Sequence, residues 1–141
     1  MSSRRNIVLV EDEPTLVALY SVALQREGDI HSATCQAEAQ AILQTVVPDI
    51  ILLDLILPVT KNGQLDFVDR MGFKILAWIK EQPQLKTVPV IVMTNLDSEE
   101  DRKQAEQMGA RGYIVKSNVI PKQIIEAIEQ VLWSVGYHWL F

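Results

Sequence analysis

Two kinds of segment alternate along the chain, and this alternation constrains the fold more than any other feature of the sequence. Short runs rich in β-branched and other apolar residues have the length and composition of β-strands. The segments between them repeat apolar residues at the spacing of an amphipathic helix. Strands that alternate with helices indicate an α/β protein. The candidate strands are NIVLV (6–10), IHSAT (30–34), DIILLD (49–54), VPVIVM (88–93) and GYIVK (112–116).

The candidate strands that begin at residues 6, 49 and 88 are apolar along nearly their whole length. Both faces of such strands must be covered, which is typical of a parallel sheet with helices on both sides. Parallel neighbours are joined by right-handed crossovers. The longest interval separates the starts at 49 and 88, so we predict an insertion at VTKNGQLDFVDRMG (59–72). The insertion is interpreted either as a solvated loop or as a partner contact.

Helices are expected after each strand. The first would begin at Pro14 and end near Gly28, the fourth would be capped by Ser98 and end at Gly109, and the fifth would follow Pro121. The fourth has few apolar residues, so we expect it to dock loosely. The residues expected to face the sheet are, helix by helix, Leu16, Leu19, Tyr20, Ala23 and Leu24; Ala37, Ala41, Ile42 and Val46; Phe73, Leu76 and Ile79; Ala105 and Met108; and Ile124, Ile125, Ile128, Val131, Leu132 and Val135.

Length and composition restrict the class of protein. The 141 residues suit one domain, 1–141, and the formal net charge of −5 argues against a nucleic-acid partner. No apolar run approaches the roughly 18 residues that a membrane helix needs, and the first residues lack the apolar core of a signal peptide. The single cysteine, Cys35, cannot form an internal disulfide and is expected to be buried. We therefore expect a cytoplasmic protein with no membrane contact.

Charged side chains fall where the candidate strands end. Glu11 and Asp12 follow the first strand, Asp54 ends the third, and Lys116 ends the fifth. In an open parallel sheet, ligands bind outside the carboxyl ends of the strands, where the strand order reverses. If the first and third strands are neighbours there, the carboxylates converge and favour a hard cation such as Mg²⁺. Asp54 would then be a carboxylate nucleophile that forms an aspartyl phosphate.

Four motifs in this order resemble the receiver domain of two-component response regulators. They are LVEDE, LLDLILP, VIVMTN and GARGYIVKS, and they extend over nearly the whole chain. The resemblance implies a flavodoxin-like doubly wound sheet of five parallel strands, in the order 2-1-3-4-5, flanked by five helices. It also implies a single-domain signalling protein of the chemotaxis or phosphorelay type. Such a protein is not an enzyme in the usual sense, because it catalyses only its own phosphorylation and dephosphorylation.

The resemblance assigns a role to each site residue. Asp54 would accept a phosphoryl group from a sensor histidine kinase or a phosphotransfer protein. Asp12 would bind Mg²⁺ directly and Glu11 through water, and the backbone carbonyl of Ile56 would be a further ligand. The residues expected to hold the phosphoryl oxygens are Thr94 and Lys116, while Thr94 and Tyr113 would form the switch that changes the surface of the fourth and fifth helices.

Several positions depart from the family's pattern. Asn95 stands where receivers usually have a small residue, and Ser117 stands where a proline in a cis bond usually follows the lysine. The isomer of the Lys116–Ser117 bond is left open. The glycine expected after the phosphoacceptor loop is displaced to Gly72. Two apolar residues, Ile56 and Leu96, lie two positions after Asp54 and Thr94, where they would hinder an attacking water, so we predict slow self-dephosphorylation.

Two other functions remain open. A degenerate receiver would bind partners without being phosphorylated. Asn95 and the insertion leave this alternative open, whereas the retained acids, threonine and lysine argue against it. A phosphatase of the haloacid dehalogenase type also uses an aspartyl phosphate, but it needs a second aspartate two residues later, where Ile56 stands. Glu13 is expected to cap the first helix. The aromatic tail, residues 133–141, is expected either to pack on the domain or to form a surface for a homodimer or for an unknown output partner.

Overall fold

The structure is a computed structural model that describes residues 4–65 and 70–133. Its centre is a parallel sheet with the strand order β2-β1-β3-β4-β5, as the resemblance implied. The apolar runs form these strands because each can be covered on both faces. The strands are β1 (Asn6–Val10), β2 (Asp29–Ala33), β3 (Ile50–Leu53), β4 (Val90–Thr94) and β5 (Gly112–Val115).

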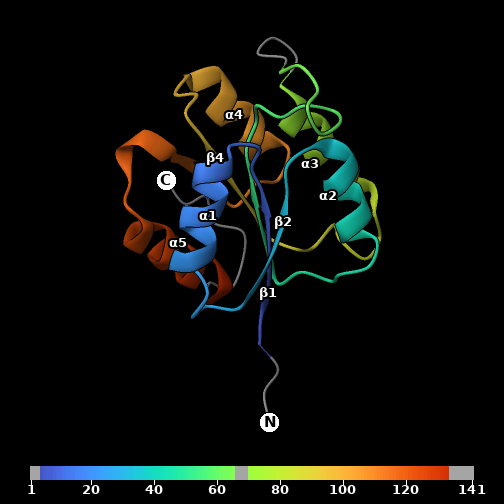
Figure 1. The fold of residues 1–141 in the computed structure, drawn as a ribbon. Helices are drawn as coiled ribbons and strands as arrows, with labels where there is room; N and C mark the ends of the chain where they lie inside the picture. The colour runs from blue at the N-terminus through green and yellow to red at the C-terminus, as the bar shows by residue number, and fades with distance from the viewer. Residues whose placement is uncertain (1–3, 66–69, 134–141) are drawn as a thin grey trace.

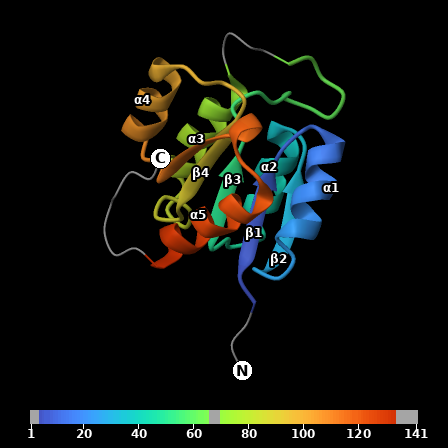
Figure 2. The same cartoon turned by 90° about the vertical axis from the view of Figure 1, so that its left-hand side faces the viewer.

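Helices cover both faces of this sheet, which Figure 1 shows edge-on. They are α1 (Pro14–Ala23), α2 (Gln36–Leu43), α3 (Met71–Glu81), α4 (Glu99–Gln107) and α5 (Pro121–Trp133). Residues of α1 and α5 share one apolar cluster, and residues of α2, α3 and α4 share the other. The carboxyl ends of the strands point to one end of the molecule, where the loops to α1, α3 and α4 gather (Figures 1 and 2).

Most of the expected helix features are confirmed. Ser98 caps α4, because its hydroxyl accepts the Asp101 N–H at 3.0 Å. The carboxylate of Glu13 caps α1 by accepting the Leu16 N–H at 3.0 Å. The apolar residues predicted to be buried in α3 are buried, and in α5 so are Ile124, Ile128 and Val131. Val135 lies outside the described residues.

The sheet-facing side of the first two helices was predicted incorrectly in part. Leu19 of α1 is 48% exposed, because this helix is apolar on nearly every side and the pattern does not single out one stripe. In α2, Ala37 and Ala41 are exposed, whereas Ala39 and Leu43 are buried. Alanine is too small and too indifferent to burial for its spacing to decide which side of a helix faces the core.

α4 packs on the sheet through few side chains. Ala105 is its only buried apolar residue among those described, and Met108, just after the helix, is half-buried. Asp101, however, is only 4% exposed. A buried carboxylate needs a charged or hydrogen-bonding partner, so α4 is held in part by polar contacts.

The insertion separates β3 from α3, which begins at Met71. Its residues 59–65 are exposed, and its Asp66 and Asp69 lie outside the described residues. The aromatic tail also lies outside them, apart from Trp133, which is 76% exposed. Cys35 is buried, as expected. Within residues 4–65 and 70–133, no helix combines the length and apolarity that crossing a membrane requires.

Candidate functional site

Strand register brings two of the predicted acidic residues together. Val10 of β1 is paired with Leu53 of the neighbouring parallel strand β3. The next residues, Glu11 and Asp54, therefore leave the sheet side by side, and the Asp54 N–H donates to the Val10 carbonyl at 3.1 Å. β1 lies between β2 and β3, so this pair stands where the strand order reverses. That is the position at which sheets of this kind bind ligands.

Lys116 reaches these carboxylates from β5, at the far side of β4. Its ammonium lies 2.7 Å from Oδ2 of Asp54 and 2.5 Å from Oε1 of Glu11. All three side chains are at least nine-tenths buried. One cation between two carboxylates leaves a net negative charge, and burial makes that charge costly.

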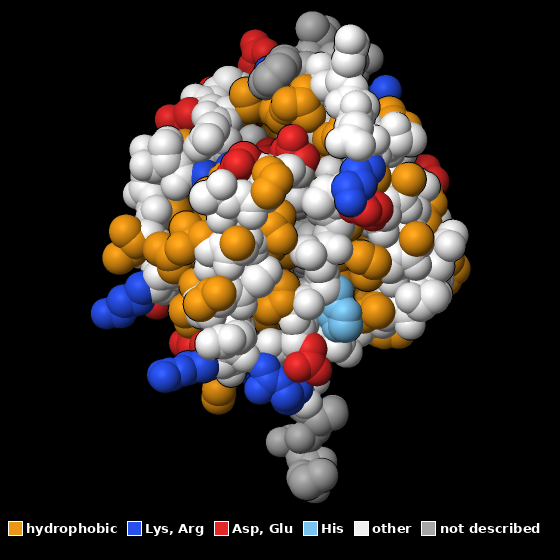
Figure 3. Space-filling view, viewed as in Figure 1, with side chains coloured by type: hydrophobic (Ala, Val, Ile, Leu, Met, Phe, Trp, Pro, Cys, Tyr) orange, Lys and Arg blue, Asp and Glu red, His pale blue; other side chains and the backbone are white. Residues whose placement is uncertain are grey.

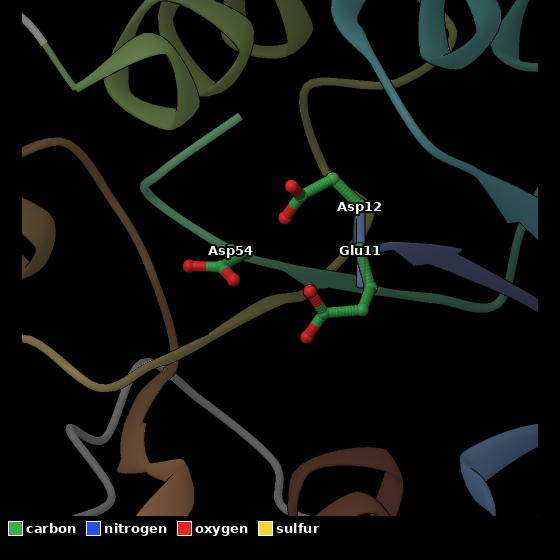
Figure 4. Close-up of side chains that lie close together, drawn as sticks. All are labelled: Glu11, Asp12 and Asp54. Atoms are coloured by element: carbon green, nitrogen blue, oxygen red, sulfur yellow. The ribbon is translucent and has the colours of Figure 1, made fainter. Parts of the chain in front are cut away.

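The carboxyl groups of Glu11 and Asp12 lie beside that of Asp54, as Figure 4 shows, and both have a raised pKa. Burial and the nearby charge of Asp54 raise the pKa of Glu11 to about 7. The same two causes raise the pKa of Asp12. For Lys116, burial lowers the pKa, but the charge of Asp54 and the hydrogen bonds to both carboxylates outweigh it and raise the pKa overall. The pocket therefore favours an additional positive charge.

A divalent cation fits this donor set. Glu11, Asp12 and Asp54 each offer a carboxylate oxygen, and these oxygens lie within 4.8 Å of one another. Oxygen-only ligands suit Mg²⁺, Mn²⁺ or Ca²⁺ rather than zinc or copper. A bound cation would offset the burial and the repulsion from Asp54 that together raise the pKa of Glu11 and of Asp12. These three residues are the carboxylates that the resemblance implied for the metal, while the Ile56 carbonyl as a further ligand stays a prediction.

The remaining predicted residues border the same hollow. A pocket of about 290 Å³ is lined by Glu11, Asp12, Asp54, Ile56, Thr94 and Lys116, among others. Thr94 is buried, and its hydroxyl oxygen accepts the Leu96 N–H at 3.4 Å. The Ile56 N–H donates to Oδ1 of Asp54 at 3.2 Å. Figure 3 shows acidic side chains bordered by hydrophobic atoms at this end of the molecule.

Gly72 packs against the backbone of the loop that begins at Asp54. A Cβ atom on Gly72 would lie 2.2 Å from the Asp54 carbonyl oxygen and 2.5 Å from the Leu55 Cα. The Gly72 N–H also donates to the Leu55 carbonyl at 2.9 Å. Only glycine lets the first turn of α3 approach the backbone of residues 54 and 55 this closely.

Asn95, one of the residues that depart from the family pattern, holds the loop after β5. Oδ1 of Asn95 accepts the Ser117 N–H at 2.9 Å. The Lys116–Ser117 bond is trans, since no peptide bond among the described residues is cis. Asn95 also lines the pocket, so one side chain both borders the site and holds the loop that carries Lys116.

Tyr113 lies beside this pocket and points into the protein. Its side chain is 1% exposed, and its hydroxyl donates to the Leu96 carbonyl at 2.7 Å. The Arg102 guanidinium lies 4.9 Å from the centre of the ring. Leu96 thus receives a hydrogen bond from Tyr113 at its carbonyl and donates one to Thr94 at its N–H. The two residues predicted to form the switch are connected through one loop residue.

Comparison with known proteins identifies the family. Residues 7–129 match the family described as the response regulator receiver domain. The chain belongs to this family. The receiver is 29% identical to an uncharacterised 14.6 kDa protein of Leptolyngbya boryana, over 91% of this chain and 90% of that protein. Several other relatives are longer, and the chain spans 16% to 53% of their lengths.

Solved receiver structures have the same fold. The phosphorylated cyanobacterial phytochrome response regulator RcpA is 28% identical, with a TM-score of 0.72 over 92% of this chain and 91% of that chain. The Mn²⁺-bound form of response regulator Rcp1 is 27% identical, with a TM-score of 0.73 over 94% and 98%. Receivers are signalling modules, and their acidic cluster is typical of a metal site.

Sequence reasoning missed two residues that line the pocket, Leu16 and Leu65. It also missed the ion pair between Arg70 and Asp101 of α4, at 2.8 Å. Leu16 was assigned to the core and Arg70 to a solvated or partner-binding loop. The only signal in the sequence was the position of the insertion soon after the strand that leads to Asp54.

Proposed function

We propose that this receiver is a phosphorylation-dependent signalling switch in which Asp54 accepts a phosphoryl group from a phosphohistidine. The donor would be a sensor histidine kinase or a phosphotransfer protein. The observation that carries the proposal is the convergence of Asp54, Lys116 and the carboxylates of Glu11 and Asp12 at the strand-order reversal. Proximity and charge neutralisation are the main requirements of phosphoryl transfer.

Each residue has a defined task in this reaction. Mg²⁺ would be held by Asp12, Glu11 and Asp54, with the Ile56 carbonyl as a further ligand, and would neutralise charge on the transferred group. The Asp54 carboxylate attacks phosphorus, the bond to the donor histidine breaks, and the imidazole leaves with the electron pair. Lys116, which contacts Asp54 at 2.7 Å, is placed to follow the phosphoryl oxygens.

The response would pass through the loop that contains Leu96. By resemblance to other receivers, the Thr94 hydroxyl turns toward the phosphoryl group. Its hydrogen bond with the Leu96 N–H would then be lost, which alters the residue whose carbonyl holds Tyr113. Shifting such a switch from 1:99 to 99:1 takes about 5.5 kcal/mol of differential binding. A cavity of about 400 Å³ beside Tyr113, Val115, Val119 and Ala127 lies on the surface that would change.

Intact mass spectrometry tests this function. With Mg²⁺ and a small acyl phosphate, the wild-type protein should gain one phosphoryl group, and Asp54→Asn or a chelator should abolish the gain. Asp49→Asn is the matched control, because Asp49 is an exposed aspartate at the opposite end of β3, where its carboxylate accepts the Asn6 N–H. Equal labelling of Asp54→Asn and the wild type would contradict the proposal.

One observation favours a second candidate, a receiver that binds partners without phosphorylation. Asn95 lines the pocket at a position where receivers usually have a small residue. A protein of this kind would give no adduct with the acyl phosphate. The change Asn95→Ala would then allow labelling, whereas under the main proposal the wild type is already labelled.

A further inference from the structure

The mouth of the Asp54 pocket is bordered by four apolar side chains from four different segments. They are Leu16 of α1, Ile56 after β3, Leu65 of the insertion and Leu96 after β4. Ile56 is 7% exposed and Leu65 is 39% exposed, while Leu16 and Leu96 are half-buried. Leu65 is therefore the most exposed of the four apolar side chains that line the pocket.

The fold fixes the ends of the insertion that carries Leu65. At its start, the Pro58 and Val59 carbonyls accept the N–H groups of Gln36 and Ala37, both at 3.0 Å. At its end, the Nε of Arg70 lies 2.8 Å from Oδ1 of the buried Asp101. These contacts tie the loop to α2 on one side and to α4 on the other.

Loss of the phosphoryl group requires water inside this apolar border. The oxygen of a water molecule attacks phosphorus, the bond to the Asp54 carboxylate oxygen breaks, and the carboxylate leaves with the electron pair. The water's protons pass to inorganic phosphate and to solvent. Apolar side chains cannot donate or accept hydrogen bonds, so they do not hold a water molecule in line for attack.

We infer that Leu65 is a positioning residue that prolongs the life of the phosphoryl group on Asp54 by limiting the approach of water. This inference rests on the proposed function. It extends the control of hydrolysis from the neighbours of the site, Ile56 and Leu96, to a side chain that the insertion delivers to the same pocket.

The test measures phosphoryl loss in the full chain after labelling with Mg²⁺ and a small acyl phosphate. The changes Leu65→Ala and Leu65→Asn should raise the first-order rate of loss by roughly three- to tenfold. Leu65→Met, which keeps an apolar side chain of similar size, should lose the phosphoryl group at the wild-type rate. Val59→Ala is the matched control, because Val59 is an exposed apolar residue of the same insertion and does not line the pocket.

If Leu65 only stabilised the fold, its replacement would also change the melting temperature or the Mg²⁺ affinity. Under the proposed role, the melting temperature and the Mg²⁺ affinity of all four variants should match those of the wild type. If the wild type is labelled but Leu65→Ala and Leu65→Asn lose phosphate at the rate of Val59→Ala, the role of Leu65 is overturned and the proposed function stands. If the wild type takes up no phosphoryl group, both fail.

Discussion

The Lys116 ammonium lies 2.7 Å from the Asp54 carboxylate, although the two residues are 62 positions apart in the chain. The parallel sheet makes this contact possible, because it brings the carboxyl ends of β3 and β5 to one edge. Asp54 is thus a buried charge with a partner, which removes much of the cost of placing a carboxylate after a buried strand. Because one ammonium faces three carboxylates, the negative charges of Glu11 and Asp12 are not fully neutralised.

Removing the ammonium should have opposite effects on metal binding and on phosphorylation. Lys116→Met leaves three carboxylates without a cation, so we expect Mg²⁺ to bind tighter by roughly tenfold, or ~1.4 kcal/mol. The phosphorylation rate should fall on the order of 100-fold, because Lys116 no longer stabilises the transferred oxygens. Titration calorimetry and intact mass measure the two effects. Lys122→Met, an exposed lysine of α5, serves as the control, and weaker Mg²⁺ binding by Lys116→Met would refute the charge argument.

The raised pKa of Glu11 predicts a pH dependence of stability in metal-free protein. Its value of about 7 in the folded chain exceeds the unfolded value of 4.5, so the folded state binds the proton more tightly. The stability gained in this way is complete below pH 4.5 and is lost as the pH rises toward 7. The melting temperature without Mg²⁺ should fall over this interval. Glu11→Gln should flatten the profile, and an identical profile in this variant would exclude Glu11 as the cause.

Protonation of Glu11, which stabilises the metal-free fold, should weaken the binding of Mg²⁺. A proton on Glu11 competes with the cation, so Mg²⁺ affinity should decrease as the pH falls below about 7. Titration of the wild type and of Glu11→Gln at several pH values measures this. The variant should bind Mg²⁺ more weakly at high pH and should vary less with pH.

Gly72→Ala should damage both folding and phosphorylation. The added methyl would meet the backbone of Asp54 and Leu55 at 2.2 to 2.5 Å, which forces either α3 or the loop after β3 to move. We expect a loss of about 2–4 kcal/mol in the free energy of unfolding and a slower labelling of Asp54. Gly63→Ala is a control with a milder steric clash. Its Cβ would lie 2.9 Å from the Thr60 carbonyl oxygen in an exposed loop, so its cost should be smaller.

The ion pair between Arg70 and Asp101 should restrain α4. Arg70→Ala leaves a buried carboxylate with the Ser98 hydroxyl, and since the Arg70 side chain is 30% exposed we expect a cost of roughly 1 kcal/mol. Hydrogen exchange in residues 99–107 should become faster, while exchange in β1 and β3 should not change. Lys103→Ala, on the exposed side of α4, should leave exchange as in the wild type.

The sequence predicts much of this structure for identifiable physical reasons. The fully apolar runs of β1, β3 and β4 require cover on both faces, and parallel strands then place Glu11, Asp54 and Lys116 at one edge. Ser98 and Glu13 cap helices through local hydrogen bonds that the pattern reveals.

The remaining features depend on contacts between segments distant in the chain. The exposure of Leu19 is set by the rotation of an almost uniformly apolar helix against the sheet. The pairing of Arg70 with Asp101 and the position of Leu65 depend on the path of an insertion that has no periodic pattern. The trans bond before Ser117 is likewise invisible to pattern reasoning.

Locating the phosphoryl group tests the central claim most directly. The protein is first phosphorylated with Mg²⁺ and a small acyl phosphate. The aspartyl phosphate on the protein is then reduced with borohydride, and the modified residue is identified by tandem mass spectrometry. The account predicts one modified residue per chain, Asp54 reduced to homoserine. Modification at any other carboxylate, or recovery of unmodified Asp54 from a protein that carries the phosphoryl mass, would contradict it.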